Sequence, residues 1–309
     1  MVLQMDNTWK VFDDITDDFE NFVQKIVPDL YLKPEVHTDV IEHIRIIRKL
    51  LELSYFEYKF CDVAALQTMM TMEMALRLRY EEINAEKWNK KLYLLIKWFE
   101  DRNYFEVYNS YYLDSLRQIR NELAHPSAHR FSGASAIHLI ENVIDLINGL
   151  YEDPLLRKGR MDITRQIIAK LDGFKKGIKC CISDKSEYLA YCAWPGFINN
   201  KIFPADINFY FNPIFTISTS YLQKSNWVVP PAVHFRACYL EFSDDKILLI
   251  NSEGERLLIS EIDRESAQIE FSKWKDTYEK HCYPTGNTIY VNEELTDTFS
   301  LHLREFHKL

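Results

Sequence analysis

Apolar residues in the first half of the chain recur at steps of three and four positions, which is the spacing of one helix face. Residues 34–57 carry one such stripe, and residues 62–82 repeat it without Gly or Pro. The same pattern predicts further helices over about residues 87–99, 111–125 and 134–151. Because the expected connections are short to medium, these helices predict an antiparallel bundle.

From about residue 179 the pattern changes to short segments that are rich in β-branched and aromatic residues and separated by turn signals. Asn251-Ser-Glu-Gly254 predicts a hairpin between the last two of these segments. Helices are expected near residues 266–283 and 295–306. We therefore expect a small α+β domain with a mainly antiparallel sheet, whose strands are predicted at residues 188–194, 207–211, 214–219, 233–242, 246–250 and 256–259.

The length of 309 residues suits two ordinary domains. We assign residues 1–155 to an all-α helical bundle, 156–180 to a basic connecting helix or linker, and 181–309 to an α+β accessory domain for sensing or binding. Residues 154–182 hold eight Lys and Arg against Asp162 and Asp172, although the formal charge of the chain is -9. This basic run predicts either a contact with phosphate or an exposed linker helix.

The six cysteines show no CxxC spacing, so we expect reduced thiols and a cytoplasmic protein. The first ten residues lack the basic-then-apolar order of a signal peptide. No apolar stretch reaches the length of a bilayer span, and we therefore expect no membrane partner.

The stretch Leu-Arg-Gln-Ile-Arg-Asn-Glu-Leu-Ala-His-Pro at residues 116–126 carries the candidate chemistry. On a regular helix Asn121 and His125 lie one turn apart, while Arg120 lies roughly 140° around the axis from His125. Pro126 ends the predicted helix at His125, so this last residue can leave ideal helical geometry. The guanidinium and the imidazole can then converge on one phosphate.

These residue types suit the cleavage of RNA by its own 2′-hydroxyl. His125 can take or give the proton near neutral pH, as general base or acid. Arg120 stays charged and offers a planar fork of donors to the phosphate oxygens. Asn121 can hydrogen-bond the phosphate or hold His125 in one tautomer. This chemistry needs no metal, and we expect no cofactor.

Each residue of the motif also has a simpler interpretation. Arg120 could form a surface ion pair with Glu122 or Asp114, His125 could cap the helix C-terminus, and Asn121 could be an ordinary surface residue. The three residues together favour a catalytic site.

Arg-Asn-x-x-x-His at the end of a bundle helix resembles the Rx4-6H signature of HEPN domains, with Arg120 and His125 at the matching positions. Residues 72–77 are similar to the long second helix of such domains, and the resemblance covers roughly residues 35–152. It implies an all-α bundle and a metal-independent endoribonuclease. It also implies a homodimer whose two motifs face each other and act on RNA, which we expect to be single-stranded or tRNA-like.

The same family contains members that do not cleave RNA, so a non-catalytic protein that dimerises or binds a nucleotide or partner is the alternative. The presence of a second domain suggests, by analogy alone, a toxin or antiviral-defence effector that an antitoxin or activating partner controls. The aromatic residues of the second half predict either base stacking, a ligand pocket or a sheet core.

Overall fold

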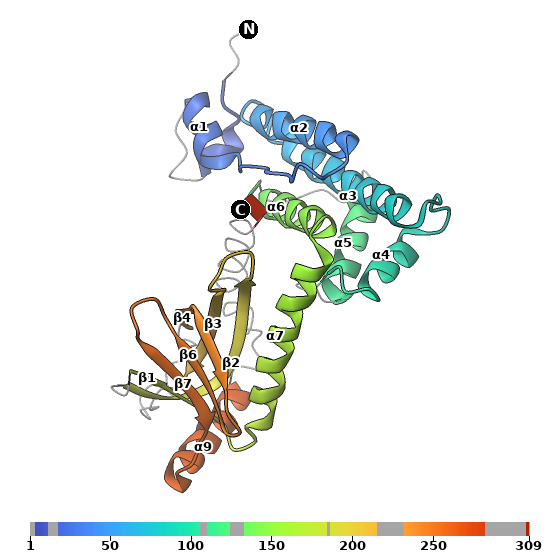
Figure 1. Ribbon diagram of the computed structural model, residues 1–309. Coiled ribbons are helices and arrows are strands. Elements are labelled where there is room, and N and C mark those ends of the chain that lie inside the picture. Colours follow the sequence, from blue (N-terminus) through green and yellow to red (C-terminus); the bar gives the residue numbers. More distant parts are fainter. Residues whose placement is uncertain are drawn as a thin grey trace. The chain divides into compact units, whose positions relative to one another are not determined.

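The computed structural model describes residues 4–11, 18–105, 110–123, 133–183, 186–214, 232–281 and 307–308. The chain divides into two compact units, with the boundary between Glu152 and Asp153. The first unit is helical, and the second is built on an antiparallel sheet (Figure 1). No helix within the described ranges is both long and apolar enough to cross a membrane.

The helix α3 is the centre of the first unit, because it packs against α2, α4, α5 and α6. Ala64, Ala65 and Ala75 are fully buried along it, and such small side chains allow neighbouring helices to approach closely. The helices predicted from the apolar stripes are present with bounds shifted by a few residues. The unit comprises η1 (Asn7–Val11), α1 (Phe19–Ile26), α2 (Thr38–Leu53), α3 (Phe60–Asn84), α4 (Leu92–Glu100), α5 (Ser110–Leu123) and α6 (Gly133–Leu150).

Local polar contacts set where several helices begin and end. The Asp18 carboxylate accepts a hydrogen bond from the backbone N–H of Asn21 at the start of α1. The His37 imidazole accepts one from Asp39 at the start of α2. At the other end of α3, Ala85 adopts a left-handed conformation with φ of 55°, and its N–H donates to the carbonyl of Glu81.

The second unit contains one seven-stranded sheet with the order β4-β3-β2-β1-β7-β6-β5, and every neighbouring pair is antiparallel. Ile167 and Leu171 of α7 share a core with Phe209 and Ile247 of the sheet. The elements are α7 (Pro154–Gly173), β1 (Ile178–Ile182), β2 (Ser186–Asn199), β3 (Asp206–Pro213), β4 (Val233–Ala237), β5 (Tyr239–Phe242), β6 (Lys246–Ile250), β7 (Arg256–Glu261) and α9 (Glu265–His281).

The sheet curls because its two edge strands are almost continuous in sequence. Only Cys238 separates β4, at one edge, from β5, at the other. Successive Cα atoms are about 3.8 Å apart, so the two edges must approach each other at this residue. The backbone N–H of Cys238 donates to the carbonyl of Ile250 at 2.8 Å, which fixes the start of β5 beside β6. Figure 1 shows the resulting curvature.

The predicted hairpin between β6 and β7 is confirmed. The Asn251 side-chain carbonyl accepts hydrogen bonds from the N–H groups of Glu253 and Glu255. Gly254 has a φ of +83°, which glycine adopts without the steric cost of a Cβ.

The fold class predicted for the whole chain is wrong. A helical part followed by a sheet is compatible with the order of elements, but the prediction of an all-α HEPN-like bundle plus a small α+β domain does not describe the structure. The second unit is dominated by a large curled antiparallel sheet, in which β3 is buried on both faces. A strand buried on both faces needs cover on each side, and a sheet that curls on itself supplies that cover.

Four other predictions differ from the structure or fall outside it. Residues 233–242 form two strands, since the chain changes edge at Cys238. β1 begins at Ile178, inside the segment assigned to the basic connection. The predicted helix over residues 295–306 lies outside the described residues, as does nearly all of the predicted strand over 214–219.

Candidate active site around Arg120

Arg120 and Asn121 lie in the last turn of α5, and His125 lies outside the described residues. Leu113 and Leu116 are buried on the side of α5 that packs against α3. Arg120 occupies the next position of the same stripe, at spacings of three and then four residues. The sequence of α5 therefore directs the Arg120 side chain towards α3.

On α3 the carboxylate of Glu73 receives this guanidinium. Arg120 Nη2 lies 3.2 Å from Glu73 Oε2, and Arg120 Nη1 donates to Asn121 Oδ1 at 3.3 Å. The Glu73 side chain is 18% exposed and that of Arg120 is 36% exposed. A guanidinium has more N–H donors than these two contacts use, and within the described residues no others are engaged. Arg120 is thus anchored and still able to bind an anion.

A second guanidinium shares the same carboxylate. Glu73 Oε1 accepts hydrogen bonds from Arg77 Nη2 at 2.8 Å and from Arg77 Nε at 3.2 Å. Arg77 Nη1 also donates to the backbone carbonyl of Trp88 at 3.0 Å. Two positive charges against one negative charge give this cluster a net positive charge, which suits a phosphate oxygen.

The neighbouring arginine of α5 has a different partner. Arg117 pairs with Asp114 at 2.7 Å, and Gln118 donates to the same carboxylate at 3.0 Å. The hydrogen bond from Arg117 lowers the pKa of Asp114. The alternative in which Arg120 pairs with Asp114 is therefore wrong. Glu122, the other partner considered, has a side chain outside the described part of α5.

Glu73 was missed as a site residue at the level of sequence. From Phe60 to Leu76 only Asp62 and Glu73 are charged, so Glu73 interrupts an otherwise apolar or neutral stretch of the central helix. A charge at such a position needs a partner when the helix packs on several sides. Arg77, four residues later, is one partner that helical spacing predicts. Arg120 is 47 residues away and is not predictable by spacing.

The described aromatic side chains of β3 and of the strands beside it pack within the sheet. Phe209, Phe211 and Phe235 are buried in the core. Tyr210 stacks on Trp194 and on His234, its cross-strand neighbours, with ring centroids 5.9 and 4.7 Å apart. Burial raises the pKa of Tyr210 to about 12. Cross-strand pairing explains these rings.

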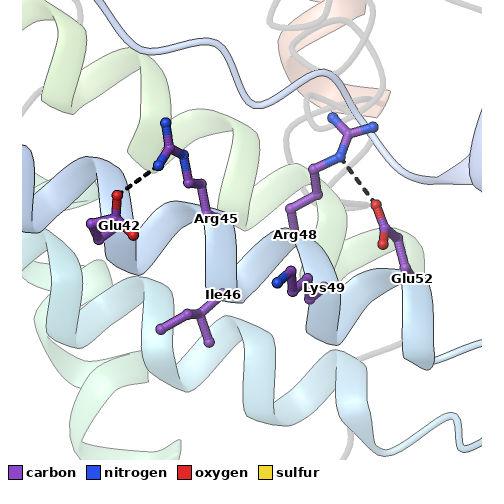
Figure 2. Close-up of a pocket in the computed structure, with 6 residues that line it drawn as sticks. All are labelled: Glu42, Arg45, Ile46, Arg48, Lys49 and Glu52. Carbon is purple, nitrogen blue, oxygen red and sulfur yellow. Dashed lines mark hydrogen bonds and ion pairs between the residues drawn. The ribbon is translucent and has the colours of Figure 1, made fainter.

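A shallow depression on α2 has no comparable chemistry. Its lining contains two ion pairs within the helix, Arg45 with Glu42 at 2.6 Å and Arg48 with Glu52 at 3.2 Å (Figure 2). These cations are neutralised by neighbours on the same face. Across the ranges that the structure describes, no three His, Cys, Asp or Glu side chains gather closely enough to hold a metal ion.

No family model, curated protein or solved structure that was compared with this chain matches it. The resemblance of the Arg120 motif to HEPN domains therefore stays a prediction.

Proposed function

We propose that this protein is an endoribonuclease that cleaves RNA by attack of a 2′-hydroxyl on the adjacent phosphate. The observation that carries the proposal is the anchoring of Arg120 by Glu73, with further N–H donors left for a phosphate. A preorganised cation of this kind stabilises the negative charge that develops on the phosphorane. Because the nucleophile belongs to the substrate, the reaction needs no activated water.

His125 is the proposed proton carrier. As general base its imidazole takes the proton of the 2′-hydroxyl, the 2′-oxygen bonds to phosphorus, and the bond from phosphorus to the 5′-oxygen breaks. The departing 5′-oxygen takes a proton from the same imidazolium or from its copy in a dimer. The products are a 2′,3′-cyclic phosphate and a 5′-hydroxyl. Asn121, which accepts a hydrogen bond from Arg120, orients the guanidinium or the phosphate.

The wider biological role that we propose rests on analogy with effectors that join two unrelated domains. A homodimer places two copies of the motif on one RNA, and an enzyme that degrades cellular RNA requires control by an antitoxin or an activating partner. We accordingly propose a toxin or antiviral-defence effector of the cytoplasm. The described cysteines are free thiols, which agrees with a reducing compartment: Cys61, Cys180, Cys181, Cys192 and Cys238.

The test compares the full-length protein with Arg120→Ala and His125→Ala on a labelled mixed RNA pool in excess EDTA. Arg117→Ala is the matched control, because Arg117 lies on the same helix, is 35% exposed and also pairs with one carboxylate. We expect cleavage by the parent and by Arg117→Ala, with cyclic phosphate ends, and at least a hundredfold loss in the other two. Equal cleavage by all four proteins would refute the assignment.

A non-catalytic binding protein is the second candidate function. The observation that favours it is the same ion pair, since a guanidinium held by a carboxylate also serves as a purely structural link between α3 and α5. This candidate predicts RNA or nucleotide binding without any product in the assay above. It also predicts that Arg120→Ala lowers stability and leaves binding unchanged.

A further inference from the structure

Aromatic and basic residues alternate along the chain from the end of α3 to the end of α4. Residues 86–102 contain five Lys and Arg against Glu86, Glu100 and Asp101, which is a local excess of positive charge in a chain whose net charge is -9. Two indoles and two cations of this region form what we call the aromatic–basic patch, defined by Trp88, Lys90, Trp98 and Arg102. Such alternation is typical of surfaces that bind single-stranded nucleic acid.

A buried tyrosine holds the two indoles in place. Tyr80 of α3 meets Trp88 edge-to-face at 4.7 Å and Trp98 edge-to-face at 5.0 Å between ring centroids. The Tyr80 hydroxyl donates to Glu86 at 2.5 Å, which fixes the ring between them. Tyr80 is buried, whereas both indoles are only partly buried. The indoles therefore have a rigid support on one side and access to solvent.

A cation lies over each indole. Arg102 Cζ is 4.0 Å from the centroid of Trp98, and Lys90 Nζ is 5.7 Å from that of Trp88. Neither cation has a carboxylate partner among the described residues, and both are exposed. Arg45 and Arg48 on α2, by contrast, are neutralised by glutamates of the same helix (Figure 2). The charge of the patch thus remains available to an anionic ligand.

Trp88 packs against the edge of the helical core, but core packing alone does not require an indole. Its indole N–H is buried and has no hydrogen-bond acceptor within the described residues. An unsatisfied buried donor destabilises a fold, and a phenylalanine at this position would pack without that cost. The indole offers instead a larger face for stacking.

Arg77 connects the patch to the candidate active site. Arg77 donates to the carbonyl of Trp88 and to the carboxylate of Glu73, and Glu73 also holds Arg120. These contacts link the backbone of Trp88 to the guanidinium that we assign to the scissile phosphate.

We infer that the aromatic–basic patch binds unpaired RNA bases next to the cleavage site, so that the substrate is single-stranded RNA. This inference rests on the proposed function and deepens it. Lys90 and Arg102 move from the indole faces to the backbone phosphates, and bases stack in their place. Bases within a duplex are covered by their neighbours and cannot stack in this way. A duplex would use the cations and leave the indoles without a role.

The experiment measures binding apart from cleavage. Fluorescence anisotropy in EDTA follows a labelled twelve-nucleotide single-stranded RNA and its duplex, with full-length Arg120→Ala as the host protein so that the RNA stays intact. We expect the single strand to bind at least tenfold more tightly than the duplex, and Trp88→Ala to raise the Kd of the single strand about tenfold. Trp88→Phe retains an aromatic face for stacking and should raise the Kd of the single strand less than threefold.

Controls separate stacking, charge and folding. Tyr93 is a 50% exposed aromatic of α4 without a ring contact among the described residues, and Tyr93→Ala should leave the Kd unchanged. Combined Lys90→Ala and Arg102→Ala should lower the salt slope of binding by about 1.4. Single-stranded DNA of the same sequence should compete, because it stacks equally, and should not be cleaved, because it lacks the 2′-hydroxyl.

Equal binding of duplex and single strand, or an unchanged Kd in Trp88→Ala, would overturn the inference, as would an equal loss in Tyr93→Ala. If circular dichroism shows that Trp88→Ala does not fold, the Kd of Trp88→Phe and the salt slope of the combined Lys90→Ala and Arg102→Ala variant decide the question. The two proposals fail separately. If the patch variants bind RNA as the host protein does while cleavage by the parent depends on Arg120, only the inference about the patch is refuted. If the patch variants lose binding while Arg120→Ala still cleaves RNA as fast as the parent, only the proposed chemistry is refuted.

Discussion

Replacement of Glu73 by Gln should separate the structural and catalytic parts of the Arg120 cluster. The substitution keeps the shape of the side chain and removes the charge that two guanidiniums share. Partly exposed ion pairs contribute up to about 1 kcal/mol each, so the loss of both should lower the free energy of unfolding by about 1 to 2 kcal/mol. Urea unfolding followed by circular dichroism measures this change.

The kinetic effect should divide between kcat and KM. Without the Glu73 carboxylate the Arg120 side chain is no longer held in one orientation. Displacement of a catalytic group by about 1 Å can reduce the rate by about a hundredfold. We expect kcat to fall at least tenfold. The site also loses one negative charge, and an elementary charge about 6 Å away in water is worth about 0.7 kcal/mol. KM for RNA should therefore fall, by about threefold.

Glu82→Gln on the same helix is the matched control. Glu82 pairs with Arg79 at 3.0 Å and its side chain is 36% exposed, so its loss should lower stability by less than about 1 kcal/mol and leave kcat unchanged. A double-mutant cycle of Glu73→Gln with Arg120→Ala measures their coupling directly. Lower stability of Glu73→Gln with unchanged kcat would mean that Glu73 is structural only. Additive effects in the cycle would contradict the assigned ion pair.

Three further outcomes test the packing of the two units. Burial raises the pKa of the Cys61 thiol to about 11, so the folded state keeps a proton that the unfolded state loses above about pH 9. Stability should fall by up to about 1.4 kcal/mol per pH unit between pH 9 and 11, and Cys61→Ala should flatten this decline in urea titrations. Gly196→Ala places a Cβ 2.3 Å from a ring carbon of Tyr210 and should lower the stability of the sheet unit by about 1 to 3 kcal/mol in the same assay. The Cβ added by Gly149→Ala meets no atom within 4 Å, so this substitution should raise the free energy of unfolding of the helical unit by about 0.5 kcal/mol. A lower thermal midpoint would contradict the open space around Gly149.

The helices were predictable because one local rule sets them. Apolar spacing located α2, α3 and α6 to within a few residues, since each buries a stripe against its neighbours. The positions of several strands were also readable from short apolar segments, and the hairpin between β6 and β7 was readable from the turn at Asn251. These features depend on residues that are near one another in sequence.

The remaining features depend on distant contacts. β1 carries two cysteines directly after Lys179 and was predicted to begin within a basic run, yet Cys180 is fully buried and its strand pairs with β2 and β7. The change of edge at Cys238 has neither Gly nor Pro to mark it. It follows only from the closure of the whole sheet. The size and curvature of the sheet were missed for that reason.

The candidate site shows the same division. The types and spacing of Arg120 and Asn121 were visible in the sequence, and the position of Arg120 on the stripe of Leu113 and Leu116 fixes its direction. The partner was not visible. Local reasoning offered acidic residues of α5 itself, whereas the structure supplies Glu73 from another helix and gives Asp114 to Arg117.

A net charge of -9 bears on how such a site could select RNA. At physiological ionic strength the Debye length is about 8 Å, so an approaching strand responds to nearby charges and little to the rest of the chain. The Arg77 and Arg120 pair retains one positive charge after Glu73 is counted. Phosphate attraction of that size is too weak to hold a strand alone, so the proposed binding depends also on Lys90 and Arg102 and on stacking at Trp88 and Trp98. The proposed nuclease would contact paired RNA through its cations alone, so it would prefer strands whose bases are unpaired.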